Sequence, residues 1–197
     1  MTSDQIIAFL GFSIVAAITP GPSNVMITAT GAAAGFVRGL PCAVGAAIGM
    51  GALLFCAALG LGQLVLGWPT LLAVMNGCGA AFLLWLAWKI GTAGTASPST
   101  NSEPVGFMGA ALFQWANPKG WLVAVGAAGT HLQGAADQLA QALAFGALFF
   151  AAALPSGLVW LLLGAVLQRT LQGERAARLF NRVMGALLAA SVIVLLV

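Results

Sequence analysis

Two short segments place polar and helix-breaking residues inside long apolar runs of the sequence. The first is TPGPSN, residues 19–24, and the second is QWANPKG, residues 114–120. Both carry proline and asparagine, and the second adds Lys119, whose ammonium can bind an anionic group. Amide, hydroxyl and ammonium groups grouped in this way indicate hydrogen-bonded recognition of a small polar ligand.

The prolines in these segments predict interruptions in two helices. A proline inside a helix removes a hydrogen bond and clashes with the preceding turn, at a cost of about 3 kcal/mol. In lipid, such a break is tolerated only where protein buries it or a wet cavity solvates it, and it exposes a helix N-terminus that attracts anions. A simple kink is the alternative, because proline is common in membrane helices. The residues predicted to bind the ligand are Thr19, Pro20, Gly21, Pro22, Ser23, Asn24, Gln114, Asn117, Pro118 and Lys119.

The composition indicates that both segments belong to a membrane protein. Hydrophobic residues make up 61% of the chain and charged residues 6%, with a mean hydropathy of +1.03. Seven Lys and Arg and four Asp and Glu cannot cover the surface of a soluble domain. The sequence has no basic stripe with interleaved aromatic residues, so we expect no nucleic-acid partner. The expected surroundings are a lipid bilayer.

Six apolar stretches are long enough to cross about 30 Å of hydrocarbon. They cover residues 5–28, 40–66, 71–90, 105–129, 139–167 and 179–197. The first is too long for a signal-peptide core and follows no basic region, so we expect it to be retained as a helix. Cys42, Cys56 and Cys78 all fall inside these stretches, where a thiol behaves as a small apolar group. The predicted fold class is an all-α integral membrane protein with six transmembrane helices.

The two halves of the chain resemble each other. Pro20 and Pro118 lie 98 residues apart in a chain of 197, and Asn76 and Asn181 each precede a patch of small residues. Three spans in each half make the second half cross the membrane in the opposite sense, so we predict an inverted 3+3 repeat whose first and fourth helices are broken by proline. The halves form a single domain, with repeats at 1–93 and 105–197 and a cytoplasmic linker at 94–104.

The cations predict the orientation, because cytoplasmic loops are enriched in Lys and Arg near helix ends. Six Lys and Arg flank the spans on one side, and none does so on the other. They are Arg38, Lys89, Arg169, Arg175, Arg178 and Arg182. We therefore expect a multi-pass protein of the plasma (inner) membrane with both termini periplasmic or extracellular, and with segments 31–39, 91–104 and 168–178 in the cytoplasm.

Motifs along the whole chain support a family assignment. TPGPSN at 19–24, GFVRGLPCAVGAAIGMGALL at 35–54, FLLWLAWKIGTA at 82–93 and NPKG at 117–120 together resemble the LysE/RhtB family of amino-acid exporters. The ending RLFNRVMGALLAASVIVLL is similar to the subgroup that includes the cysteine and O-acetylserine exporter. The resemblance implies an inner-membrane secondary carrier that expels amino acids or related metabolites by proton antiport, without a cofactor. Carried over by position, the family's motif residues are Pro20, Gly21, Pro22, Asn24, Asn117, Pro118 and Lys119.

One departure from the family pattern concerns the fifth span. Threonine- and homoserine-type members often carry an aspartate where this chain has Ser156, which is a possible contributor to the site. The four acidic residues lie outside or at the edges of the spans: Asp4, Glu103, Asp137 and Glu174. Without an acid in the site, a neutral amino acid such as cysteine, O-acetylserine or threonine is favoured over a cationic one. Proton coupling through Lys119, through Asp4 or Asp137, or through carbonyl groups stays open.

Lys119 is the expected principal anchor for a substrate carboxylate. An ammonium at membrane depth costs at least about 2.5 kcal/mol, and no acid is predicted at the same depth. We therefore expect its hydrogen-bonding capacity to be incompletely used until substrate binds, with the substrate's own ammonium on carbonyl oxygens freed by the breaks. Snorkelling of Lys119 to the membrane surface is the alternative.

Other functions and assemblies are compatible with parts of the sequence. A metal-ion or other small-solute exporter of the same superfamily is the alternative function, although the three cysteines lack metal-ligand spacing. A membrane enzyme with a Ser23–Lys119 dyad is a further alternative, and His131 is expected in an external loop. Gly45 and Gly49, four residues apart, serve either packing within the chain or a homodimer face.

The charge pattern predicts the outcome of a labelling experiment. With Thr100 replaced by cysteine in a background without the native cysteines, a thiol reagent that cannot cross the membrane should label the protein only after the cells are opened. Labelling in intact cells would contradict the predicted orientation.

Overall fold

All elements in the described part of the chain are helices. The computed structural model describes residues 1–62, 64, 67–92, 105–131, 137–170 and 174–196. The helices are α1 (Ser3–Ile18), α2 (Pro22–Cys56), the π-helical turn η1 (Ala57–Leu61), α4 (Pro69–Gly91), α5 (Phe107–Ala116), α6 (Pro118–His131), α7 (Gln138–Thr170) and α8 (Glu174–Leu196). The predicted all-α class is confirmed for these residues, and the linker predicted at 94–104 lies outside them.

The outer faces of these helices are apolar, as expected of a protein surrounded by lipid. Exposed large apolar side chains include Val74, Trp85 and Trp88 on α4, Leu139, Leu143 and Val159 on α7, and Leu179 and Val183 on α8. Within the described residues, Pro22–Leu61 and Gln138–Leu167 are long and apolar enough to cross a bilayer, and Ser3–Ile18 is a shorter apolar helix. These apolar faces and helices support the predicted membrane protein, while its six crossings stay a prediction.

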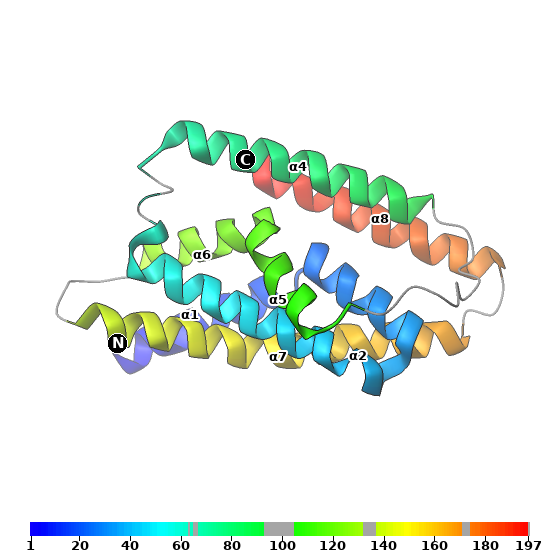
Figure 1. Ribbon diagram of the computed structural model, residues 1–197, viewed down its shortest axis with the longest axis horizontal. Helices are drawn as coiled ribbons and strands as arrows, with labels where there is room; N and C mark the ends of the chain where they lie inside the picture. The colour runs from blue at the N-terminus through cyan, green and yellow to red at the C-terminus, as the bar shows by residue number, and fades with distance from the viewer. Residues whose placement is uncertain (63, 65–66, 93–104, 132–136, 171–173, 197) are drawn as a thin grey trace.

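The long helix α2 is two limbs joined by a sharp turn at Gly35. This residue has a φ of 80° and a ψ of 175°, in the region that favours glycine. Residues twelve apart in a straight helix are separated by about 18 Å. Here, however, the Thr30 hydroxyl lies 3.6 Å from the Cys42 sulfur, so the chain doubles back between them. Figure 1 shows the two limbs, blue and cyan, running in opposite directions.

Each of the two proline-containing segments lies where one helix ends and the next begins. After α1 ends at Ile18, the chain is extended at Thr19 and at Gly21, and α2 starts with Pro22. After α5 ends at Ala116, Asn117 is extended and α6 starts with Pro118. Proline is well suited to the first position of a helix because its missing N–H is not needed there. The motifs thus determine where α2 and α6 begin.

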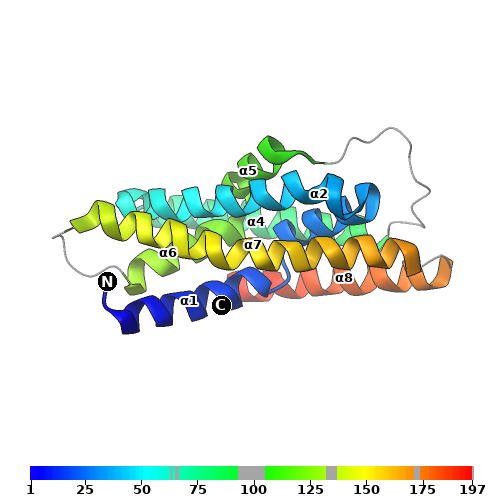
Figure 2. The same ribbon diagram turned by 90° about the horizontal axis from the view of Figure 1, so that it is seen from below.

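The helices pack in pairs that combine the two halves of the chain. α2 packs along α7 and against α5, α1 packs against α7, and α4 pairs with α8. In both views α7 runs the length of the bundle, and in Figure 1 the α4–α8 pair lies along one side of it (Figures 1 and 2). One apolar core joins α1 to α7, where the rings of Phe9 and Phe145 meet edge to face at 4.4 Å. A second joins Val25 of α2 to residues of α4 and α8.

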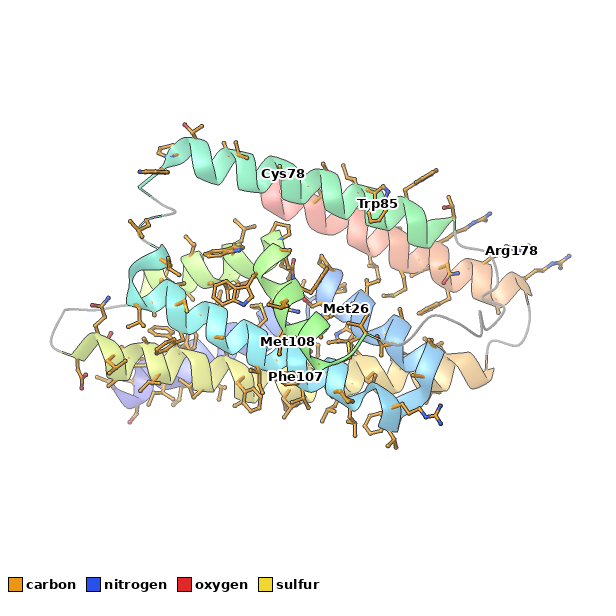
Figure 3. The ribbon with its side chains drawn as sticks, viewed as in Figure 1. Met26, Cys78, Trp85, Phe107, Met108 and Arg178 are labelled. Carbon is orange, nitrogen blue, oxygen red and sulfur yellow. The ribbon has the colours of Figure 1, made fainter. Side chains whose placement is uncertain are left out.

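The ends of the helices fall into two groups. The Gly35 turn, the end of α4, the end of α7 and the start of α8 lie at one end of the bundle, while the start of α1, the start of α4 and the start of α7 lie at the other (Figure 1). Arg178 projects from the first of these ends (Figure 3). The described residues next to the segments predicted to share the cytoplasmic side therefore lie at the same end of the bundle.

Glycines on α2 and α7 bring helix backbones into direct contact. A Cβ at Gly45 or Gly49 would collide with the carbonyl of Phe107 or Ala111 on α5. A Cβ at Gly164 on α7 would collide with the carbonyl of Thr28. The small residues of the second predicted span are thus occupied by packing within the chain, so Gly45 and Gly49 are not available as a face for a second copy.

This packing predicts a strong difference between two Gly→Ala variants. Gly164→Ala should lower the thermal stability of the purified protein in detergent, because forcing a methyl group into a filled contact costs about 1–3 kcal/mol. Gly126→Ala on α6 is the matched control, since a Cβ there has no atom within 4 Å and alanine favours a helix by about 0.5–1 kcal/mol. Equal melting temperatures for the two variants would contradict close backbone packing at Gly164.

Candidate binding site at the two helix breaks

Lys119 joins the two breaks. It is the second residue of α6, and the Asn117 side chain caps this helix by accepting a hydrogen bond from its backbone N–H at 3.2 Å. Its ammonium crosses to the other break and donates to the Thr19 carbonyl at 2.5 Å and to the Pro20 carbonyl at 3.4 Å. A residue of the second half of the chain therefore binds backbone oxygens freed by the break in the first half.

The C-terminal end of α1 also receives donors from α2 and α7. The Asn24 side-chain amide donates to the Ala17 carbonyl at 3.0 Å and to the Thr19 carbonyl at 2.9 Å. The Ser156 hydroxyl donates to the same Ala17 oxygen at 3.0 Å. Since a carbonyl oxygen has two lone pairs, the Ala17 and Thr19 oxygens each have their full number of donors. The backbone groups left without helical partners at this end of α1 are hydrogen-bonded inside the protein.

A chain of three polar side chains links α2 to the second break. The Ser23 hydroxyl donates to the Gln114 amide oxygen at 2.7 Å and accepts from the Asn117 amide at 2.9 Å. The Gln114 amide nitrogen donates to the Ala110 carbonyl at 3.0 Å. Gln114 and Asn117 are 0% and 2% exposed, and Ser23 is half-buried, so most of this network is shielded from solvent. Such satisfied networks fix the side chains in one arrangement.

A cavity lies between the two breaks. It contains about 510 Å³ of space not filled by protein atoms, including the solvent at its mouth. Its polar part is lined by Gly21, Ser23, Asn24, Gln114, Asn117 and Lys119. Its apolar part is lined by Ala16, Ala17, Ile27, Ala43, Ala46, Ala47, Met50, Gly120, Val123, Phe149, Ala153 and Gly157. Apolar walls with a few convergent polar groups are typical of a small-molecule site.

Gly21 allows the lysine to pass between the breaks. A Cβ built at this position would lie 2.8 Å from Cδ and 3.1 Å from Nζ of Lys119. Its backbone is extended, with a φ of −172° and a ψ of 179°, so the requirement for glycine comes from space and not from backbone conformation. In the described part of the chain, no side chain caps α2 at Gly21, and its N-terminus faces the cavity without a fixed acceptor.

The structure brings the predicted site residues together, but not all in the same role. Of the ten residues in the two motifs, six line the cavity, and Thr19 and Pro20 supply carbonyl oxygens to Lys119. Pro22 and Pro118 are buried at the starts of α2 and α6, and Ser156 contacts the end of α1. The apolar walls, including Met50 and Phe149, carry no signal in the sequence, because such residues are common throughout a membrane helix.

The contacts bear on two of the expectations about this site. Two of the three N–H donors of the Lys119 ammonium go to carbonyl oxygens, so its hydrogen-bonding capacity is incompletely used, as expected before substrate binds. The Ala17 and Thr19 oxygens each accept two hydrogen bonds already, whereas the Pro20 oxygen accepts one from Lys119. A Ser23–Lys119 dyad is not formed, because the Ser23 hydroxyl donates to Gln114 and Lys119 is directed at the first break. Among the described residues, no group of three or more His, Cys, Asp or Glu is close enough to hold a metal ion.

A lipid-facing helical bundle that encloses a polar cavity between helix ends has the architecture of membrane transport proteins. Residues 14–197 match the model of the family described as LysE type translocator, so the chain belongs to this family. The description of this family as a translocator agrees with the prediction from the sequence of a transport protein and not of an enzyme.

Several curated relatives carry the name cysteine/O-acetylserine efflux protein. The Salmonella choleraesuis protein is 32% identical over 120 residues, which are 60% of this chain and 61% of the relative. The Klebsiella pneumoniae protein is 32% identical over 178 residues, 86% of each chain. The Escherichia coli O1:K1 protein is 27% identical over 189 residues, 95% of each chain. This chain thus spans about 61% of the length of the Salmonella relative. No solved structure matches this chain.

The hydrogen bonds at the end of α1 predict the effect of removing Asn24. Asn24→Ala should insert in the membrane but melt at a lower temperature, because two carbonyl oxygens lose a buried donor and each unsatisfied group costs about 1–3 kcal/mol. Ser13→Ala is the control: its hydroxyl donates to the Phe9 carbonyl within the same helix, α1, and lies outside the cavity lining. If both variants melted alike, Asn24 would not have a special role at the break.

Proposed function

We propose that this protein exports neutral amino acids or closely related small metabolites across the plasma membrane as a secondary transporter. The observation that carries the proposal is the cavity, where polar groups from both helix breaks converge in a chain of a translocator family. The names of the relatives support cysteine and O-acetylserine as the first substrates to test, with threonine as a similar small amino acid.

We further propose that residues 1–93 and 105–197 are inverted repeats of one transport domain, with transmembrane helices one and four broken at their prolines. The packing supports this, because α1 of the first half packs on α7 of the second, and α5 of the second half packs on α2 of the first. α4 and α8, the last helix of each half, pair with each other. Phe9 and Phe107 lie 98 residues apart, as do Pro20 and Pro118, and each phenylalanine is at such a contact.

Two groups in the cavity would hold the carboxylate of the substrate. An ammonium has three N–H donors, and two of those on Lys119 go to the Thr19 and Pro20 carbonyls. The third donor is available to an anion. The N-terminus of α2, at Gly21, has no side-chain cap within the described residues and offers free N–H groups at the positive end of a helix dipole. A carboxylate between Lys119 and the N-terminus of α2 would accept hydrogen bonds from both.

The remainder of the cavity supports a small, uncharged substrate side chain. Among the described lining residues none is acidic, so a cationic side chain would lack a counter-charge. Alanine and glycine make up most of the apolar walls, and Ile27, Met50 and Phe149 are the large apolar groups. Thioether and aromatic surfaces suit a thiol or a short ester better than a charged group. These walls favour substrates of the size of cysteine, O-acetylserine or threonine.

We also propose that export is coupled to proton entry and that both termini lie outside the cell. Lys119 is the one ionisable side chain among the described residues that line the cavity, so it is the natural proton carrier there. Arg178, which projects from one end of the bundle (Figure 3), supports a cytoplasmic position for that end.

Export from loaded vesicles tests the function. Vesicles containing the protein and labelled cysteine, O-acetylserine, threonine, leucine or lysine should lose the small neutral compounds faster than vesicles without protein, and should retain lysine. Faster loss under an imposed proton gradient would support antiport. Preferential loss of lysine, or no loss of any amino acid, would refute the proposed substrate class.

Lys119→Met tests the carboxylate anchor. The substitution keeps the side-chain stem and removes the charge, so the variant should insert as well as wild type but export at least about tenfold more slowly, the effect of a single lost charged hydrogen bond. Lys119→Arg should recover only part of the rate, because a planar guanidinium does not reproduce a compact point charge. An amino-acid amide should compete poorly with the free acid. Normal export by the Met variant would show that the carboxylate binds elsewhere.

A further inference from the structure

The C-terminal end of α1 presents carbonyl oxygens to a single positive charge. We propose that this end of α1 is a monovalent-cation site whose built-in occupant is the ammonium of Lys119. In membrane carriers with broken helices, unwound carbonyls and helix C-terminal ends are the groups that bind coupling cations such as Na⁺. In this chain the same kind of position is filled by a cation that is covalently attached to the opposite half of the bundle.

The contacts of the ammonium are those of a bound cation. Its nitrogen lies 2.5 Å from the Thr19 oxygen and 3.4 Å from the Pro20 oxygen, and both oxygens belong to the extended link after α1. The end of α1 contributes the negative pole of its helix dipole, which stabilises a positive charge placed there. Among the described residues that line the cavity there is no carboxylate, so these dipoles balance the charge of Lys119.

The surrounding residues shape this position before any cation enters. Asn24 donates to the oxygens of Ala17 and Thr19, and Ser156 donates to that of Ala17, so the carbonyl groups are held in place from α2 and α7. Gly21 leaves the space that the lysine stem occupies, since a Cβ there would be 2.8 Å from Cδ. Residues of α1, α2 and α7 thus form the site, and the Lys119 side chain from α6 fills it.

A built-in cation has a consequence that is independent of the exported molecule. The wild-type protein should require no Na⁺ for stability, because the Lys119 ammonium occupies this site. Removing the lysine side chain empties the site and creates a binding place for a free cation of matching shape. Lys119→Ala lacks three methylene groups and the ammonium, and n-propylammonium contains these same groups.

The test measures melting temperature in detergent and involves no transport, so it is independent of the export assay. n-Propylammonium should raise the melting temperature of Lys119→Ala by at least about 2 °C at concentrations well above its dissociation constant. It should leave wild type unchanged. n-Propanol, which has the stem without the charge, should not stabilise the variant. Equal shifts for wild type and variant, or equal effects of the amine and the alcohol, would overturn the proposal.

A second variant keeps the test decisive if Lys119→Ala does not fold. Lys119→Met retains a side-chain stem and lacks only the charged head, so the ammonium ion should stabilise it and n-propylammonium should not. In wild type, replacing Na⁺ by N-methylglucamine should leave the melting temperature unchanged. A clear fall of the wild-type melting temperature without Na⁺, or indifference of the Met variant to ammonium, would refute a built-in cation.

Discussion

The structure depends on satisfying the backbone oxygens at the end of α1. A helix end inside an apolar bundle has no water to hydrogen-bond its last carbonyls, and each one left alone would cost several kcal/mol. Asn24, Ser156 and Lys119 supply the donors, from α2, α7 and α6 respectively. This requirement brings three helices from distant parts of the sequence to a single point, and the cavity lies beside that point because the donors have to converge there.

Close approach of backbones makes this convergence possible. Gly21 lets the lysine stem pass, while Gly45, Gly49 and Gly164 let α2 contact α5 and α7 without intervening side chains. With larger residues the helices would stand further apart, and a serine or asparagine side chain could not span the gap at 3 Å. The glycines and the polar residues therefore depend on each other. The glycines set the short distance between the helices, and only at that distance can the polar side chains hydrogen-bond across to α1.

Some of this organisation can be predicted from the sequence, and some of it depends on three-dimensional contacts. Proline and asparagine in two motifs correctly indicate where a polar cluster forms. These residues are costly inside apolar helices and are seldom placed there for packing alone. The partners of these residues could not be predicted. The sequence points to Lys119 as an anchor for a ligand but not to the carbonyls of the first break that it binds, since backbone oxygens leave no trace in a sequence. The cavity wall formed by Met50 and several alanines was equally hidden, because these residues resemble the rest of the helices.

The turn at Gly35 concerns the way in which the chain enters the membrane. Pro22–Leu61 is one apolar stretch of 40 residues without a polar loop, although it folds into two limbs. No polar loop separates the limbs for the insertion machinery, so we expect them to enter lipid together as a helical hairpin. Arg38, just after the turn, is the charge that marks its tip. The shape of this hairpin depends on one glycine with a positive φ and on contacts within the first half of the chain, such as that of Thr30 with Cys42.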